Sequence, residues 1–141
     1  MLVLLDVNVI LDVLGRREPH FSPAAELWSA IEAGKANGLI AAHTVTTLFY
    51  LLQRHTNTQR ATAAVRDLMR VFSVAPVDGA VLLEALGLKW KDFEDAVQMA
   101  AAARAGAEYL ITRNPGDFEG GTVPVLQPGE FTALLRGSQV S

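Results

Sequence analysis

The chain has 141 residues, of which half are hydrophobic and 19% are charged, a composition typical of one compact folded domain and not of a disordered segment. It contains no cysteine, which excludes disulfides, thiolate nucleophiles and cysteine-ligated zinc and leaves oxygen and imidazole groups as metal ligands. Twelve Lys and Arg against fifteen Asp and Glu give a net charge of −3, so any nucleic acid must be bound locally and not by a global positive field.

Strand and helix patterns alternate along the chain. Continuously apolar runs predict buried strands of a parallel sheet, and apolar residues at helical spacing predict helices that cover it. In chain order we predict a strand at 2–7, a helix at 22–34, a strand at 39–43, a helix at 44–54, a helix from 58 through 69, a strand at 72–77, a helix at 78–86, an alanine-rich helix that ends near 106, and strands at 108–112 and 123–126. Ser22 and Thr58 are the predicted N-caps of their helices, and Gly106 suits a C-terminal glycine stop. Pro124 marks the last strand as an edge strand, because proline donates no hydrogen bond to a neighbouring strand.

This alternation predicts the fold class. Strands that alternate with helices form a right-handed, mostly parallel sheet with helices on both faces. We therefore expect a single α/β domain over residues 1–141, with three α/β/α layers and a central sheet of four to five strands. No apolar stretch approaches the roughly 18 residues that cross a membrane, so we expect a cytoplasmic protein without a membrane segment.

Polar residues follow the predicted strands at the edge where open α/β sheets bind ligands. They are Asp6 and Asn8 after the first strand, Asp92 and Asp95 at the start of the alanine-rich helix, and Thr112, Arg113, Asn114 and Asp117 after the strand at 108–112. Asp92 and Asp95 are three residues apart and share a helix face, whereas Glu94 points about 200° away from Asp92 and is the weaker candidate. Carboxylates within about 4 Å repel by a few kcal/mol per pair, so their convergence predicts a divalent cation or retained protons.

Each acidic group also has a purely structural interpretation. Asp92 fits the N-cap of the alanine-rich helix, and Asp95 fits its first turn, where the helix dipole favours negative charge. Asp117 fits a turn within "NPGDF". Asp6 is harder to explain in this way, because a carboxylate at the end of a buried strand loses solvation and needs hydrogen bonds, a cation or a metal to stay charged.

Four segments together resemble the PIN domain, the ribonuclease fold found in VapC-type toxins. They are "LLDVNVILD", "AAHTVTTLFYLL", "KDFEDAVQMAAA" and "YLITRNPGDF", and they occur in the family's order. The resemblance implies that Asp6 is the first metal-binding aspartate and Asn8 its polar companion. It also implies that Asp95 is the acidic residue that opens the long helix, with Asp92 as a nearby helper.

Two positions depart from the family's pattern. The closing motif of the family often reads Thr-x-Asp, whereas here Asn114 stands at the last position, and we expect Asp117 to supply the carboxylate instead. Thr47 stands where the family usually carries a glutamate, in the helix after the second strand. A hydroxyl is a weak, neutral ligand, so the loss of one negative charge should weaken a Mg²⁺ site. The enzyme either works with fewer carboxylates or is impaired.

The resemblance implies a Mg²⁺-dependent endoribonuclease, with Mn²⁺ as a substitute, that acts as the toxin of a type II toxin–antitoxin pair. The ions would lower the pKa of a bound water and neutralise charge on the scissile phosphate. Their catalytic and metal-binding groups would be Asp6, Asp95 and Asp117, with Asp92 beside them. Thr112 and Asn114 would orient waters or phosphate oxygens, and Arg113 would contact the RNA backbone. The same resemblance implies a cognate antitoxin and a homodimer, with which the mean hydropathy of +0.25 agrees.

Two other functions remain as alternatives. The missing glutamate at Thr47 fits a catalytically impaired PIN-like module that binds RNA or serves as a scaffold. A haloacid-dehalogenase-like phosphatase also begins with a strand-end aspartate, but it needs a second aspartate where Asn8 stands. Neither Gly-x-Gly-x-x-Gly nor a Walker pattern follows the first strand, so the sequence does not support nicotinamide or ATP binding.

Overall fold

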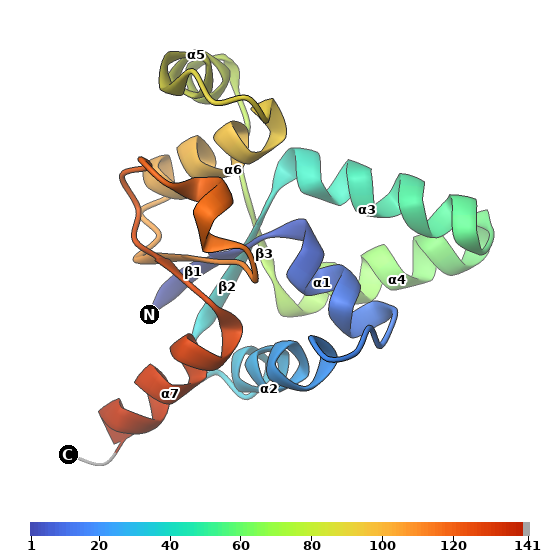
Figure 1. Ribbon diagram of the computed structural model, residues 1–141. Helices are drawn as coiled ribbons and strands as arrows, with labels where there is room; N and C mark the ends of the chain where they lie inside the picture. The colour runs from blue at the N-terminus through green and yellow to red at the C-terminus, as the bar shows by residue number, and fades with distance from the viewer. Residues whose placement is uncertain (140–141) are drawn as a thin grey trace.

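The computed structural model describes residues 1–139, and within them five parallel strands form one sheet (Figure 1). The strands are β1 (Leu2–Leu5), β2 (Asn37–Ala41), β3 (Ser73–Ala75), β4 (Tyr109–Ile111) and β5 (Val125–Leu126). Their order across the sheet is β3-β2-β1-β4-β5, so β1 is the central strand and pairs with both β2 and β4. The predicted parallel sheet is confirmed, and β5 lies at its edge, as Pro124 indicates.

Helices cover both faces of this sheet and complete a three-layer α/β/α fold. They are α1 (Val7–Leu14), α2 (Phe21–Glu32), α3 (Ala42–His55), α4 (Thr58–Val71), α5 (Gly79–Leu88), α6 (Phe93–Arg104), α7 (Pro128–Gln139) and the short 3-10 helix η1 (Pro115–Phe118). In Figure 1, α5 and α6 lie on one side of the sheet, and α1, α2 and α7 lie on the other. Within residues 1–139, no helix combines the length and the apolar character that crossing a membrane requires.

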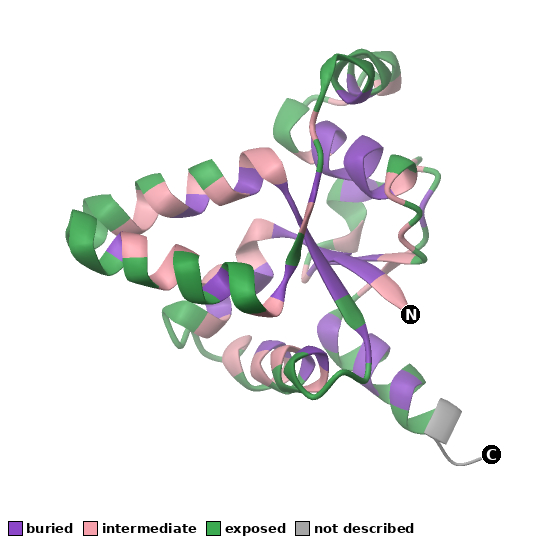
Figure 2. Cartoon of the chain, turned by 180° about the vertical axis from the view of Figure 1, so that it is seen from behind, coloured by how far each residue is buried: buried purple, intermediate pink, exposed green. Residues whose placement is uncertain are grey.

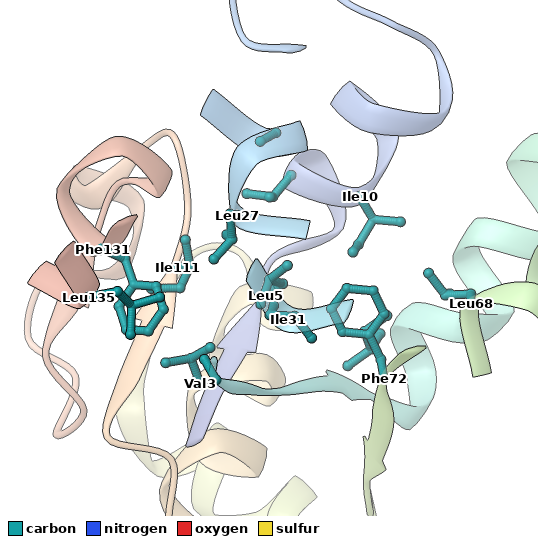
Figure 3. Packing of buried hydrophobic residues seen from close by; sticks show 14 of the residues in the cluster. Val3, Leu5, Ile10, Leu27, Ile31, Leu68, Phe72, Ile111, Phe131 and Leu135 are labelled. Atoms are coloured by element: carbon teal, nitrogen blue, oxygen red, sulfur yellow. The ribbon is translucent and has the colours of Figure 1, made fainter. Parts of the chain in front are cut away.

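Each face of the sheet has its own hydrophobic core. Side chains of a strand alternate between faces, so Val3 and Leu5 of β1 point into one core and Leu4 points into the other. Figure 3 shows the first core, in which Leu27, Phe131 and their neighbours from α1, α2, α4 and α7 pack against β1. The second core is built by α5, α6 and η1. Figure 2 shows the central strands buried and the outer faces of the helices exposed.

Two helices were not predicted from the sequence. The predicted strand at 2–7 ends at Leu5, and α1 begins at Val7, so Asp6 lies at the junction with an extended backbone (φ −65°, ψ 150°). Apolar residues continue through the junction, because Val9 and Ile10 are buried on one side of α1, and composition therefore does not mark the change. Helix α7 was also missed, although Phe131 and Leu135 have the four-residue spacing of a buried helix face.

Two predicted helix caps were wrong. Helix α2 begins at Phe21 with His20 at its N-cap, so Ser22 lies inside the helix. The cap of α4 is Asn57 and not Thr58, because the Asn57 side chain accepts a hydrogen bond from the backbone N–H of Arg60 at 2.8 Å. An asparagine side chain serves this purpose as well as a hydroxyl, so two adjacent capping residues leave the first position of a helix ambiguous.

Two other helix ends confirm the sequence interpretation. Asp92 is the N-cap of α6, and its Oδ1 accepts a hydrogen bond from the backbone N–H of Asp95 at 3.1 Å. Gly106 follows α6 with φ +78°, a left-handed conformation that favours glycine. The start of α6 is therefore held by a side chain that the sequence also proposed for a metal site.

We expect Gly38→Ala to destabilise the protein by about 1–3 kcal/mol. A Cβ at residue 38 of β2 would lie 2.6 Å from the Phe72 ring, which is packed into the first core and cannot move away freely. Urea unfolding measures the change. Gly79→Ala at the start of α5 is the matched control, because a Cβ there meets nothing within 4 Å and should leave the stability unchanged or slightly higher. Equal stability of the two variants would contradict the packing described for β2.

Candidate functional site

Asp6 is a buried carboxylate at the end of the central strand, with 3% of its surface exposed. Its backbone N–H donates to Ile111 O at 2.9 Å, which ties the end of β1 to β4. Its side chain does not cap α1. Instead, Oδ1 accepts a hydrogen bond from Gln98 Nε2 at 3.0 Å, and Oδ2 accepts one from Thr112 Oγ1 at 2.9 Å. Two neutral donors, one on α6 and one after β4, thus hold the carboxylate in place.

Gln98 connects Asp6 to a second carboxylate. Its Nε2 lies 3.4 Å from Asp95 Oδ1, so a single amide group spans Asp6 and Asp95. Gln98 is 2% exposed, and its Oε1 is buried without a hydrogen-bond partner among the described residues. The sequence analysis missed this residue. The available signal was a lone polar residue in the buried run "AVQMAAA", three positions after Asp95 and therefore on the same helix face.

The environment of Asp95 shows how closely the acidic groups gather. Burial, followed by the charges of Asp92, Asp6, Asp117 and Glu94 in that order, raises the pKa of the half-buried Asp95 carboxyl from 3.8 to about 7. These carboxylates come from the end of β1, the start of α6 and the segment after β4. Folding therefore brings acidic groups from three distant parts of the chain into one electrostatic neighbourhood, as the sequence predicts.

An open cavity of about 820 Å³ lies beside the start of α6. Its acidic lining residues are Asp92, Glu94, Asp95, Asp117 and Glu119. Lys91 is the one cation among the described residues that line it, and Trp90 and Phe93 form its aromatic part. This excess of negative charge attracts cations and repels anions such as a phosphate backbone.

Thr47 lies beside this cavity and not within the apolar core of α3. Its Oγ1 is 3.2 Å from His43 O and 3.4 Å from Glu94 Oε1, so the hydroxyl faces the start of α6. The sequence makes Glu94 the weaker candidate, because it does not share a helix face with Asp92. In the structure the cavity spans more than one face of α6, and Glu94 lines it together with Asp92 and Asp95.

Thr112 and Arg113 are not among the described residues that line the acidic cavity. Thr112 is fully buried, and its hydroxyl donates to Asp6 and accepts from the Asn114 N–H at 3.1 Å, so it positions Asp6. Arg113 Nη1 lies 3.6 Å from Oδ1 of Asp12, a buried carboxylate that the sequence analysis did not single out. Arg113 lines a separate cavity of about 260 Å³ at the start of α7, and it does not line the acidic cavity.

Asn8 and Asn114 are adjacent to the site but carry no side-chain hydrogen bond to it among the described residues. Asn8 lies in the first turn of α1, and its main-chain oxygen accepts a hydrogen bond from Arg17 at 3.4 Å. Asn114 is exposed and precedes η1, which carries the exposed Asp117. Asp117 lines the acidic cavity, as does Glu119, so the segment after β4 brings two carboxylates to this place.

The oxygen donors near Asp6 and Asp95 limit which cation the site could hold. Within residues 1–139, no three His, Asp or Glu side chains are gathered closely enough to hold a metal ion by themselves. Asp6, Asp95 and the unpartnered Gln98 Oε1 offer hard oxygen donors at one place. Such a set fits Mg²⁺ or Mn²⁺ that keeps several waters, and it does not fit an ion that needs a complete protein cage.

The PIN domain family model matches residues 2–115 of the chain. The chain belongs to the PIN domain family. No curated protein sequence matches it. Among solved structures, this PIN domain is similar to VapBC-1 from nontypeable Haemophilus influenzae, with a TM-score of 0.71, 17% identity and coverage of 91% of this chain and 98% of that chain.

Two further solved structures share the fold. A toxin–antitoxin complex from Klebsiella pneumoniae has a TM-score of 0.67 and 25% identity, and the match covers 89% of this PIN domain and 97% of that chain. VapC20 from Mycobacterium tuberculosis, described as a sarcin–ricin loop cleaving toxin, has a TM-score of 0.63 and 18% identity, and the match covers 77% and 86% of the two chains.

We expect Asp95→Asn to stabilise the metal-free PIN domain increasingly as the pH rises from 5 to 8. The pKa of Asp95 is about 7 in the folded state and near 3.8 in the unfolded chain, so the folded state binds more protons between these values and loses stability as the pH rises through them. The variant removes this loss. Urea unfolding in EDTA at several pH values measures it, with Asp67→Asn on the exposed part of α4 as the control. A stability difference independent of pH would contradict the crowding described at Asp95.

Proposed function

We propose that this PIN domain is a Mg²⁺-dependent endoribonuclease and the toxin of a type II toxin–antitoxin pair. The observation that carries the proposal is the single amide of Gln98, which links the buried Asp6 to Asp95, a residue that lines the acidic cavity, while its own oxygen has no partner among the described residues. RNA as the substrate is supported by the shared fold with a toxin described as cleaving the sarcin–ricin loop. The acidic cavity supports the need for a cation, because it repels an RNA backbone otherwise.

The side chains of the site have distinct roles in this proposal. Asp6, Asp95 and Asp117 would hold Mg²⁺ and its waters, and the ion would lower the pKa of a bound water and neutralise charge on the scissile phosphate. Asp6 is kept in one orientation by two hydrogen bonds. The pKa of Asp95 is about 7 without a cation, so its carboxyl is partly protonated at neutral pH, and a bound cation would favour the ionised form. Asp92 adds charge while its Oδ1 caps α6.

A cognate antitoxin is the partner that we propose, together with self-association as a homodimer. The fold is shared with a chain solved in a toxin–antitoxin complex. Helix α5 exposes Leu82, Leu83 and Leu86, and Leu83 is 71% exposed. Apolar side chains clustered on one exposed helix suit a surface that a partner covers.

A non-catalytic RNA-binding or scaffold module is the second candidate. Thr47 lacks a carboxylate, and the described residues hold no ready cluster of three acidic or imidazole ligands, which are the observations in its favour. A phosphatase with Asp6 as nucleophile has less support, because Asp6 is buried and both of its oxygens accept hydrogen bonds.

We expect cleavage of structured RNA when the protein is incubated with Mg²⁺, no cleavage in EDTA, and recovery of cleavage with Mn²⁺. Asp6→Asn and, independently, Asp95→Asn should lower the cleavage rate by roughly 100-fold, because each removes charge that stabilises the cation. Asp67→Asn, far along α4, should leave the rate unchanged. Gel analysis of cleavage products measures the rates, and circular dichroism verifies the folding of each variant. Intact RNA with both metals, together with RNA binding by the folded protein, would favour the scaffold module.

A further inference from the structure

The carboxylate of Glu94 lies where α3 meets the start of α6. Thr47 Oγ1 on α3 is 3.4 Å from Glu94 Oε1. His43 Nε2, one turn earlier on α3, is 3.2 Å from the main-chain oxygen of Glu94. One contact joins the main chain at the first turn of α6 to the first half of α3, and the other places the Glu94 carboxylate next to Thr47.

We propose that Glu94 supplies the carboxylate that position 47 lacks, and that Thr47 acts as its positioning residue. This inference rests on the proposed function and deepens it by adding a residue to the same site. A glutamate at position 47 would extend from α3 toward the start of α6. Here Glu94 extends from α6 toward α3 and meets Thr47, so the negative charge occupies the same region from the opposite helix.

The Glu94 carboxylate is free to interact with a cation. Among residues 1–139, the carboxylate has one hydrogen-bond contact, with the Thr47 hydroxyl that it shares with His43 O, and no Lys, Arg or His side chain forms an ion pair with it. Asp92 differs, because its Oδ1 is used to cap α6. Glu94 lines the acidic cavity together with Asp95, so its charge makes the electrostatic potential in that cavity more favourable for a cation.

A second observation concerns the buried amide of Gln98, which contacts Asp95, one of the residues that line the cavity. The Gln98 side chain is 2% exposed, its nitrogen contacts Asp6 and Asp95, and its oxygen has no partner. A buried amide oxygen without a donor is unfavourable unless a cation or its water fills the position. Mg²⁺ and Mn²⁺ keep several waters, and a carboxylate at the cavity wall binds such waters without touching the ion. Glu94 is placed for this role.

The test uses Mn²⁺ alone as the probe and the full chain as the protein, with free Mn²⁺ followed by electron paramagnetic resonance. Glu94→Gln keeps the size of the side chain and its contact with Thr47 but removes the charge. We expect its Mn²⁺ dissociation constant to rise about tenfold, because residues that bind the waters or ligands of a metal, and not the metal itself, typically have effects of this size. Glu119→Gln removes the same charge from the same cavity without a contact to Thr47. It should change the constant by less than about threefold, because Glu119, unlike Glu94, is not among the charges that act on Asp95, and the interaction between exposed charges falls off quickly with distance.

A rescue experiment separates a specific role from a structural one. Thr47→Glu in the Glu94→Gln background returns a carboxylate to the region from α3, and we expect the Mn²⁺ dissociation constant to return to within about threefold of the wild-type value. If Glu94 only stabilised the contact between α3 and α6, a glutamate at position 47 would not restore the Mn²⁺ dissociation constant. Circular dichroism confirms that each variant is folded before titration.

The outcomes distinguish this inference from the proposed function. The role of Glu94 would be overturned if Glu94→Gln and Glu119→Gln lowered the Mn²⁺ affinity equally, or if Thr47→Glu did not restore the affinity of Glu94→Gln. Wild-type affinity in Glu94→Gln together with lost binding in Asp95→Asn would also overturn it but leave the proposed metal site intact. Wild-type affinity in Asp95→Asn, or no Mn²⁺ binding by the wild-type protein, would overturn both.

Discussion

Asp6 ends the central strand as a carboxylate that is 3% exposed, and its oxygens accept hydrogen bonds from Gln98 and Thr112. A buried charge without hydrogen bonds is strongly unfavourable. Thr112 reaches the strand end because β4 lies beside β1, and Gln98 reaches it from α6. The hydrogen bonds of this one side chain thus join the end of β1, the segment after β4 and α6.

The same arrangement concentrates negative charge that the chain alone does not neutralise. The pKa of Asp95 rises to about 7, since burial and four other carboxylates oppose its ionisation. Gln98 separates Asp6 from Asp95 with a neutral amide, which reduces their repulsion but leaves one amide oxygen without a partner. Stability in the metal-free state is thus lower than the packing alone would give, as is common where a fold holds charges together for a ligand.

The contact between Thr47 and Glu94 shows why a missing residue at one position does not establish a missing charge in space. Position 47 carries a hydroxyl, yet a carboxylate from the neighbouring helix lies 3.4 Å from it. Helices α3 and α6 face each other, so a carboxylate can reach the same region from a residue on either helix. A family pattern compares residues at the same position along the chain, whereas a cation interacts with every charge near it in space.

The sequence by itself determined the parallel α/β sheet, the edge position of β5, the cap at Asp92, the glycine stop at Gly106 and the acidic groups that gather near Asp95, because apolar periodicity, proline and short polar motifs act locally. It did not reveal α1, α7 or Gln98. Apolar residues continue from β1 into α1, and a single buried amide forms no recognisable sequence pattern. The tertiary structure alone decided that Arg113 pairs with Asp12 and that Glu94 meets Thr47. These pairings join residues on separate elements, and their geometry follows from how the helices pack and not from spacing along the chain.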